Sequence, residues 1–264
     1  MRIALTIAGS DSGGGAGIQA DLKTFQQFGV FGTSVIVALT AQNTRGVTAV
    51  HAVPDEIVQA QLAAVLDDLP PAAVKTGMLA TALLVDRVAQ SIRDRRLPNY
   101  VLDPVMVATS GDRLLDRDAE RLVRDVLVPL AAVVTPNTDE AAILVEDPVD
   151  TVPAMERAAK ALVLMGADAA LVKGGHLEGE VVTDILATPS GVTRYTHPRL
   201  ATTSTHGTGC TLSAAITAGL ARGRSLSRAV EDALDFVHRA MAAAPGLGGG
   251  HGPLNHLVAG PADA

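Results

Sequence analysis

The sequence predicts one α/β domain in which helices flank a central, mostly parallel sheet. Short apolar runs typical of buried strands alternate with longer segments of helical spacing, which is the pattern of successive βαβ units. With 264 residues, 48% of them hydrophobic and 19% charged, the chain is long enough to bury a large core. Because no linker, repeat or low-complexity tract divides it, we expect a single domain over residues 1–264 with no second domain fused to it.

The first element is expected to be the strand Ile3–Ala8, because this segment is a compact apolar run. Residues 11–17 are rich in Gly and Ser and are expected to form a turn. The segment after it carries apolar residues at helical spacing, namely Ile18, Leu22, Phe25 and Phe28. Ser34–Ala41 is rich in Val and Ile, so we expect it to be the second buried strand.

Pro54 is expected to open the next helix, because proline is favoured in the first helical turn. The later helices are expected at Thr81–Arg96, Asp116–Leu127, Thr138–Val145, Pro153–Met165, Gly209–Ala221 and Leu226–Ala243. The later strands are expected at Ala73–Gly77, Tyr100–Met106, Ala132–Thr135 and Ala169–Lys173. Val181–Leu186 and Val192–Tyr195 are expected to form a short antiparallel pair, and a Gly-rich loop begins at about residue 246.

The composition argues against several classes of function. The net charge is −7, from 21 basic and 28 acidic residues, whereas proteins that bind nucleic acid are usually basic. No apolar run approaches the length of about 18 residues that spans a membrane, and the apolar start is too short for a signal peptide. The lone cysteine fits the reducing cytosol. We therefore expect a cytoplasmic protein that binds neither nucleic acid nor membrane.

Ligands of such sheets bind outside the carboxyl ends of the strands. The residues that follow the expected strands are strongly polar and rich in glycine. They are Gly9–Gly17, Gln42–Asn43, Lys75–Met78, Asp103–Met106, Pro136–Glu140, Lys173–His176 and His206–Cys210.

The first Gly-rich loop, residues 9–17, lies between the first expected strand and helix. It lacks the G-K-[ST] ending of a Walker A loop, which argues against a P-loop NTPase. Residues 15–20 match the loose dinucleotide fingerprint, but no Asp or Glu stands between positions 21 and 55 to bind a ribose. A tight turn between strand and helix is the simple alternative.

The second Gly-rich loop, Thr205–Thr211, opens a helix. Glycines let backbone N–H groups converge there, and the helix dipole adds partial positive charge, so a phosphate is the natural ligand. At such a position we expect a lowered pKa for Cys210, which would make it a thiolate base or nucleophile. The alternative is a plain helix start with a small buried cysteine.

Seven strings carry a resemblance over nearly the whole chain. They are AGSDSGGGAGIQADLKTF (Ala8–Phe25), AQNTRGV (Ala41–Val47), KTGML (Lys75–Leu79), LDPVM (Leu102–Met106), TPNTDEA (Thr135–Ala141), KGGH (Lys173–His176) and THGTGCTLSAA (Thr205–Ala215). In this order and spacing they resemble the hydroxymethylpyrimidine/phosphomethylpyrimidine kinases of thiamine biosynthesis, within the ribokinase superfamily. The resemblance implies a ribokinase-like fold without a separate lid, usually as a homodimer.

The same resemblance implies transfer of the γ-phosphoryl group of ATP with Mg²⁺, at one site and in two steps. The first acceptor is 4-amino-5-hydroxymethyl-2-methylpyrimidine and the second is its monophosphate. Cys210 is then the base of the first step, where most of the superfamily has Asp. The second acceptor is already anionic and needs no base.

The resemblance places the anion hole for the transferred group at Gly207, Thr208 and Gly209. Lys173 is expected to pair with phosphate oxygens. The alternative for Lys173 is a solvated surface lysine, but the adjacent Gly174 and Gly175 favour close approach of a ligand.

Asn137 and Glu140 form an N-x-x-E pattern just after an expected strand, on one face of the first helical turn. Glu140 is expected to hold Mg²⁺ through water, and a helix cap is the compatible alternative. Asp103 is expected to help order the metal or the phosphates, although Asp-Pro also simply ends strands.

The pyrimidine needs an apolar slot with a few polar groups, for which the candidates are Gly9, Asp21, Gln42, Met78 and Val105. The amide of Gln42 offers both a donor and an acceptor, which suits an aminopyrimidine. Met78 and Val105 have core packing as their alternative, and Asp21 a place in the first helical turn.

Three other functions stay open. Pyridoxal kinases belong to the same superfamily, and we expect them to differ at position 42. A sugar kinase would carry a lid insertion, which is not visible between Ser34 and Gly77, and an Asp in place of Cys210. A non-catalytic pyrimidine or phosphate sensor would bind ligand without turning over ATP. His51, His197 and His238 are dispersed along the sequence, and we expect no zinc site.

Overall fold

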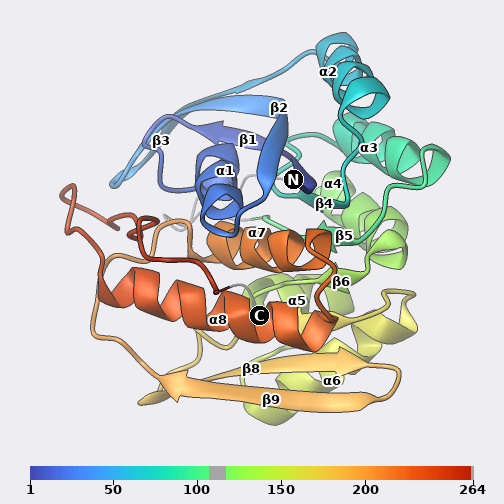
Figure 1. The fold of residues 1–264 in the computed structure, drawn as a ribbon. Coiled ribbons are helices and arrows are strands. Elements are labelled where there is room, and N and C mark those ends of the chain that lie inside the picture. The colour runs from blue at the N-terminus through green and yellow to red at the C-terminus, as the bar shows by residue number, and fades with distance from the viewer. Residues whose placement is uncertain (107–116, 263–264) are drawn as a thin grey trace.

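Nine strands form one sheet in the computed structural model, which describes residues 1–106 and 117–262 (Figure 1). In sheet order they are β3 (Gly46–Ala52), β2 (Phe31–Asn43), β1 (Ile3–Asp11), β4 (Ala73–Thr76), β5 (Tyr100–Leu102), β6 (Val133–Val134), β7 (Ala170–Val172), β8 (Val181–Thr188) and β9 (Gly191–Pro198). The pairs from β2 to β7 are parallel, and β3, β8 and β9 pair antiparallel with their neighbours. The expected mostly parallel sheet is confirmed.

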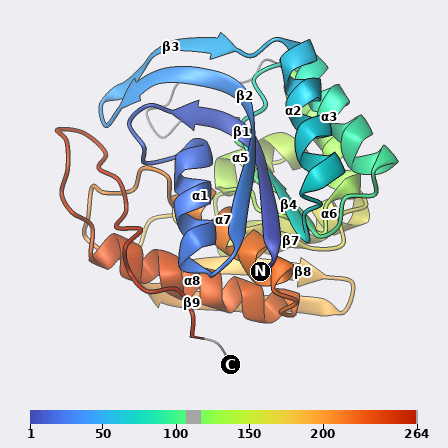
Figure 2. The same cartoon turned by 45° about the horizontal axis from the view of Figure 1, so that its top comes forward.

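Helices cover both faces of this sheet (Figure 2). Those in the described ranges are α1 (Gly17–Gln27), α2 (Asp55–Asp68), α3 (Ala82–Asp94), α4 (Arg117–Leu122), α5 (Thr138–Val145), α6 (Val152–Leu164), α7 (Thr208–Ala221) and α8 (Leu226–Ala242). Neighbouring strand residues point to opposite faces, so Leu5 packs in the core under α2–α6, and Ala4 packs in the core under α1, α7 and α8. In the part of the chain described, no helix combines the length and the apolar character needed to span a bilayer.

The order of elements follows the sequence closely, and two of the boundaries that differ have an identifiable reason. β1 continues to Asp11, beyond the apolar run, because its last residues pair with β2 past a bulge at Ala8 and Gly9. β5 ends at Leu102, so the expected strand to Met106 is too long. Pro104 explains this early end, since proline has no N–H to donate to a neighbouring strand.

The antiparallel edge strand β3 was not expected from the sequence. All its residues are half-buried or exposed, and Val50 is 49% exposed, so β3 lacks the buried apolar pattern that identifies a strand. The helix expected at Asp116–Leu127 is also different. In the described residues α4 ends at Leu122 and the chain continues as a π-helical turn, η1 (Val123–Leu127), and a 3₁₀ turn, η2 (Val128–Leu130). Asp116 lies outside the described residues.

The Gly-rich tail is a loop, as expected, and it is bonded to two other loops. The His251 N–H donates to the carbonyl of Thr44 in the β2–β3 turn, at 2.8 Å. The Gly252 carbonyl accepts from the His206 N–H, just before α7, at 3.1 Å. A Cβ at Gly250 would collide with the Thr44 backbone, which explains a glycine there. The tail therefore connects the β2–β3 turn with the start of α7.

Candidate active site

A cavity of about 910 Å³ opens at the carboxyl ends of the parallel strands. Twelve of the thirteen site residues expected from the sequence line it. They are Gly9, Gln42, Met78, Asp103, Val105, Asn137, Glu140, Lys173, Gly207, Thr208, Gly209 and Cys210. Residues far apart in sequence thus meet where the sheet topology predicts a ligand site.

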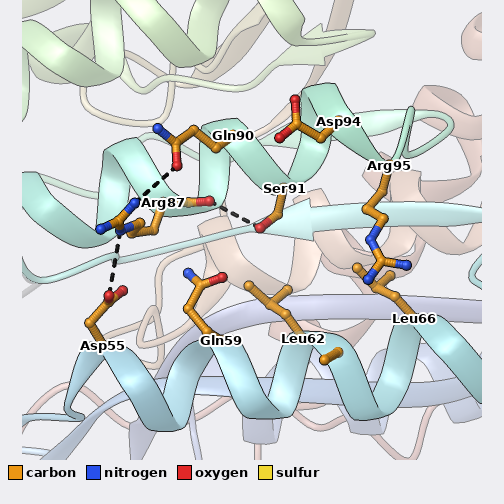
Figure 3. A pocket seen from close by; sticks show the side chains of 10 residues that line it. Asp55, Gln59, Leu62, Leu66, Arg87, Gln90, Ser91, Asp94 and Arg95 are labelled. Atoms are coloured by element: carbon orange, nitrogen blue, oxygen red, sulfur yellow. Dashed lines mark hydrogen bonds and ion pairs between the residues drawn. The ribbon is translucent and has the colours of Figure 1, made fainter.

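A smaller cavity of about 350 Å³ lies between α2 and α3 (Figure 3). Its most prominent polar group is Arg87, which lies 3.4 Å from Asp55 and donates to Gln90 at 3.2 Å. The expected site residues all lie elsewhere. We therefore place the candidate active site in the larger cavity.

The second Gly-rich loop forms the start of α7 at the cavity wall. Gly207 has a φ of +82°, and a Cβ there would collide with the carbonyl oxygen of Gly15. The N–H and the hydroxyl of Thr208 both bond to the Thr205 carbonyl, at 3.3 and 2.7 Å. The N–H groups of Gly209 and Cys210 follow in the first turn, where helical N–H groups have no partner within the helix and attract anions.

Five charged side chains form a row of alternating sign beside this loop. The Lys75 ammonium lies 2.9 Å from both carboxylate oxygens of Asp21 and 3.9 Å from Asp103. The Lys173 ammonium lies 3.3 Å from Asp103 and 3.9 Å from Glu140. Each ammonium thus stands between two carboxylates, which offsets the cost of burying these charges. We call these five residues the charge row.

The charge row fixes the protonation of its members. Burial alone would lower the pKa of Lys75, but the attraction of Asp21 and Asp103 together with the hydrogen bonds to Asp21 outweighs it and raises the pKa, so the ammonium stays charged. The same balance, with Asp103 and Glu140 as the partners, raises the pKa of Lys173. Burial raises the pKa of Glu140 to about 7 despite the attraction of Lys173. Only Lys173 of the two lysines lines the cavity, with 14% of its side chain exposed.

The expectation of a lowered pKa for Cys210 is wrong. Burial raises the pKa of this thiol to about 12, and Asp103 and Asp21 raise it further by repulsion. The ammonium of Lys75 and the N–H of Gly17 oppose this rise without reversing it. Cys210 is therefore a neutral thiol at neutral pH in this structure.

Asp21 does not contact the cavity, so its expected place in the pyrimidine slot is corrected. Its side chain is fully buried and accepts a hydrogen bond of 2.6 Å from the hydroxyl of Thr6 as well as the two from Lys75. Asp21 lies on α1 and bonds to Thr6 in β1 and Lys75 in β4, so its carboxylate lies between this helix and the sheet. Asp21 therefore holds the buried lysine instead of a substrate.

The other four candidates for the pyrimidine slot line the cavity. A Cβ on Gly9 would lie 2.5 Å from the Met78 methyl, so glycine gives this methionine its room. The Gln42 side-chain oxygen accepts from Thr40 at 3.1 Å, and the Gln42 N–H donates to the hydroxyl of Ser12 at 2.8 Å. The amide of Gln42 is thus held by its neighbours at the edge of the slot.

Asn137 and Glu140 form a complete capping box at the start of α5. The Asn137 side-chain oxygen accepts from the Glu140 N–H, and the Glu140 carboxylate accepts from the Asn137 N–H, both at 2.8 Å. The expected cap is therefore confirmed. Among the described residues, no three His, Cys, Asp or Glu side chains gather into a metal site.

Sequence reasoning missed three features of this cavity. The first is Lys75, for which the available signal was a charged residue inside an otherwise apolar strand. The second is the buried pair of Asp11 and His206. The third is an apolar lobe lined by Val182, Leu212, Leu234, Val237, His197, His238 and Met241. The side chains of this lobe that lie on helices have ordinary helical spacing, so the sequence pattern assigns them to the core.

The histidines of this lobe are close in space, although the sequence places them apart. The rings of His197 and His238 meet edge to face, with their centroids 5.5 Å apart. His197 also lies 3.8 Å from Asp184, whose carboxylate accepts from the N–H of Gly174 at 2.9 Å.

The sheet order, the two glycine-rich loops and the cavity between them define a ribokinase-like small-molecule kinase. A family model described as phosphomethylpyrimidine kinase matches residues 11–255. The chain belongs to this family.

Individual relatives agree with this assignment. The hydroxymethylpyrimidine/phosphomethylpyrimidine kinase of Rhizobium meliloti is 53% identical over 258 residues, covering 97% of both chains. That of Bacillus subtilis is 47% identical and covers 97% of this chain and 94% of its own. Among solved structures, the ADP complex of Bacillus subtilis pyridoxal kinase has a TM-score of 0.91 at 38% identity and covers 97% of both chains.

Proposed function

We propose that this protein phosphorylates 4-amino-5-hydroxymethyl-2-methylpyrimidine and then its monophosphate with ATP, as a step in thiamine biosynthesis. The observation that carries the proposal is that the glycine loop at the start of α7 and the slot around Gln42 face one cavity. The relatives whose names state this activity are more similar in sequence than the pyridoxal kinase of similar fold, at 53% and 47% against 38% identity.

In this mechanism the acceptor oxygen attacks the γ-phosphorus while the bond to the ADP oxygen breaks. Charge builds on the transferred group, and donors that are already in place lower the barrier. The N–H groups from Gly207 to Cys210 are those donors, with the N–H of Thr208 weakened by its bond to Thr205. Lys173 contributes its ammonium to the phosphate oxygens. The charge row holds that ammonium in place, so little rearrangement is needed when the nucleotide binds.

Mg²⁺ would be held by Glu140 and Asp103, through water, and would neutralise phosphate charge when bound with ATP. Both side chains are carboxylates, whose oxygens are the ligands that Mg²⁺ prefers. Burial raises the pKa of Glu140 to about 7 even beside Lys173, so its carboxylate lacks full compensation and favours a cation. Asn137 orients Glu140 through the capping box and need not be a ligand itself.

Cys210 is the proposed base of the first step only. The hydroxymethyl proton goes to the thiolate form of Cys210 as the new O–P bond forms. Because the thiol is neutral at neutral pH, only a small fraction of the enzyme is in this form at any moment. The acceptor of the second step is an ionised phosphate oxygen, so no proton has to leave.

The apolar lobe around Val237 and His238 is the proposed adenine site. Its side chains, among them Leu212, Leu234 and Met241, give this part of the cavity an apolar lining of the kind that an aromatic base needs. The solved structure of Bacillus subtilis pyridoxal kinase, which has the same fold, contains bound ADP. We also expect a homodimer, on family resemblance, which sedimentation of the purified protein tests. A cytoplasmic location is expected from the lone cysteine and the composition.

A product-resolved assay tests the proposed function. Purified protein receives ATP and Mg²⁺ with either the hydroxymethylpyrimidine or pyridoxal, and products are followed by mass over time. A pyrimidine monophosphate that rises and then becomes the diphosphate supports the proposal. Pyridoxal phosphate as the dominant product would instead favour the pyridoxal kinase alternative, which the structural similarity keeps open.

A further inference from the structure

The carboxylate of Asp11 organises the first Gly-rich loop. Asp11 ends β1 and is 3% exposed. One of its oxygens accepts from the Gly13 N–H at 2.7 Å, and the other accepts from Gly15 at 3.0 Å and from Ala16 at 2.9 Å. The loop is therefore wrapped around a single buried carboxylate at the end of its own strand.

The fourth bond of this carboxylate reaches the other Gly-rich loop. His206 Nε2 lies 2.8 Å from the Asp11 oxygen, 195 positions away in sequence, and its ring is buried. Burial alone would raise the pKa of Asp11, but the bonds from His206 and the loop N–H groups outweigh it and lower the pKa. The carboxylate is thus ionised and only accepts, so Nε2 carries the hydrogen.

The two loops also touch through their backbones. A Cβ on Gly15 would lie 2.5 Å from the His206 ring, and a Cβ on Gly207 would collide with the Gly15 carbonyl. Only glycine fits at either position. The place of Gly207, and of the N–H groups that follow it, is therefore set by contact with the first loop.

The first loop is tied to the acceptor side as well. The Ser12 hydroxyl donates to the Gln42 carbonyl, and the Gln42 N–H donates back to the Ser12 hydroxyl oxygen, both at 2.8 Å. One short loop thus bonds to the strand end that carries Gln42 and to the histidine that precedes the anion hole.

We propose that Asp11 and His206 are positioning residues for phosphoryl transfer, whose bond aligns the anion hole with the acceptor held at Gln42. The inference rests on the proposed function, since it presupposes transfer between these two parts of the cavity. Misplacing reacting groups by about 1 Å costs about 100-fold in rate. Both phosphorylation steps depend on the same alignment, so both slow by the same factor when the bond is lost.

The test uses single-turnover rates of both steps with His206→Leu, which removes the donor. Both rates are expected to fall about 100-fold, with KM for each substrate within about threefold of wild type. His206→Gln keeps an amide N–H donor, so both of its single-turnover rates are expected to be at least tenfold higher than those of His206→Leu. Asp11→Asn keeps the shape but loses at least one accepted bond, and it is expected to slow both steps equally and by less.

His256→Leu is the matched control. His256 is as buried as His206 and bonds to the Thr211 hydroxyl of α7 at 2.9 Å, but it lies outside the cavity. His256→Leu loses this buried hydrogen bond to Thr211 but is expected to keep the rates of both phosphorylation steps. Urea unfolding of every variant separates a positioning effect from a loss of folded protein.

Three results would overturn the inference. His206→Leu could keep both rates within about threefold of the His256→Leu control, it could slow the first step alone, or it could raise KM alone. If His206→Leu does not fold, Asp11→Asn provides the test instead. Equal slowing of both steps supports the inference, and unchanged rates or slowing of one step alone overturns it. A wild-type protein that forms neither pyrimidine phosphate refutes the proposed function instead, so the two failures are distinguishable.

Discussion

Raising the pH from 7 to 9 is expected to accelerate the first phosphorylation about 100-fold relative to the second. Burial raises the pKa of Cys210 to about 12. Below that pKa the thiolate fraction grows tenfold per pH unit, from about 1 in 10⁵ at pH 7 to about 1 in 10³ at pH 9. Because the thiolate is the base, the rate of the first step follows this fraction upward.

Rapid-quench single turnovers with saturating ATP and Mg²⁺ measure both steps over this range. The second step is the internal control for other titrations, above all that of Glu140, whose pKa is raised to about 7 and whose ionisation affects both steps. Cys210→Ala is expected to give a first-step pH profile no steeper than that of the second step, and an unaltered second step. A flat wild-type profile, or a plateau below pH 9, would refute the reasoning, because neither fits a buried thiol as the base.

Three further substitutions test separate parts of the site. Lys75→Met is expected to lower the free energy of unfolding in urea by about 3–5 kcal/mol, because it leaves the buried carboxylate of Asp21 without its ammonium partner. Arg95→Gln, in a surface ion pair, should cost less than about 1 kcal/mol. Gly207→Ala is expected to lower kcat by at least about 100-fold, whereas Gly223→Ala, with the same φ of +82° but no close neighbour, should keep it. Gln42→Leu is expected to raise KM for the pyrimidine at least tenfold while KM for ATP stays unchanged, as steady-state kinetics will show.

The sequence predicts the buried elements of this fold well, and it misses the exposed edge strand β3. Strands such as Ile3–Ala8 are buried on both faces and therefore appear as uninterrupted apolar runs. β3 is held by backbone pairing with β2 at the edge of the sheet, and none of its side chains is buried in the core. Such an element is specified by its partner strand, which no local pattern reports.

The position of the site follows from the sheet topology, but its electrostatics do not. Polar residues after parallel strands meet at one sheet edge, which is why the cavity gathers nearly all the expected residues. Whether Asp21 faces a ligand or a buried lysine depends on how α1 packs against β1. The pKa of Cys210 depends on burial and on two carboxylates from other segments. These features depend on tertiary structure. The position of Cys210 at the start of a helix, taken alone, predicts a lowered pKa, which is the wrong direction.

A neutral thiol at position 210 suits an enzyme whose second acceptor is an anion. A carboxylate would be ready to act as the base at pH 7, but it would repel the phosphate oxygens of the monophosphate when they occupy the place of the hydroxymethyl group. Two like charges about 4 Å apart repel by about 4 kcal/mol at an effective dielectric constant of about 20. The charge row already holds three carboxylates against two ammonium groups, so it offers no spare cation to offset that charge.

Cys210→Asp is therefore expected to speed the first step at pH 7 and to slow the second at least tenfold. The neutral variant Cys210→Ser should lose the first step and keep the second, which separates the effect of charge from the effect of size. Single-turnover rates of both steps in the two variants measure this directly. If Cys210→Asp carries out the second step as fast as wild type, charge at this position does not limit the second phosphorylation, and another property of the thiol must explain its place in the site.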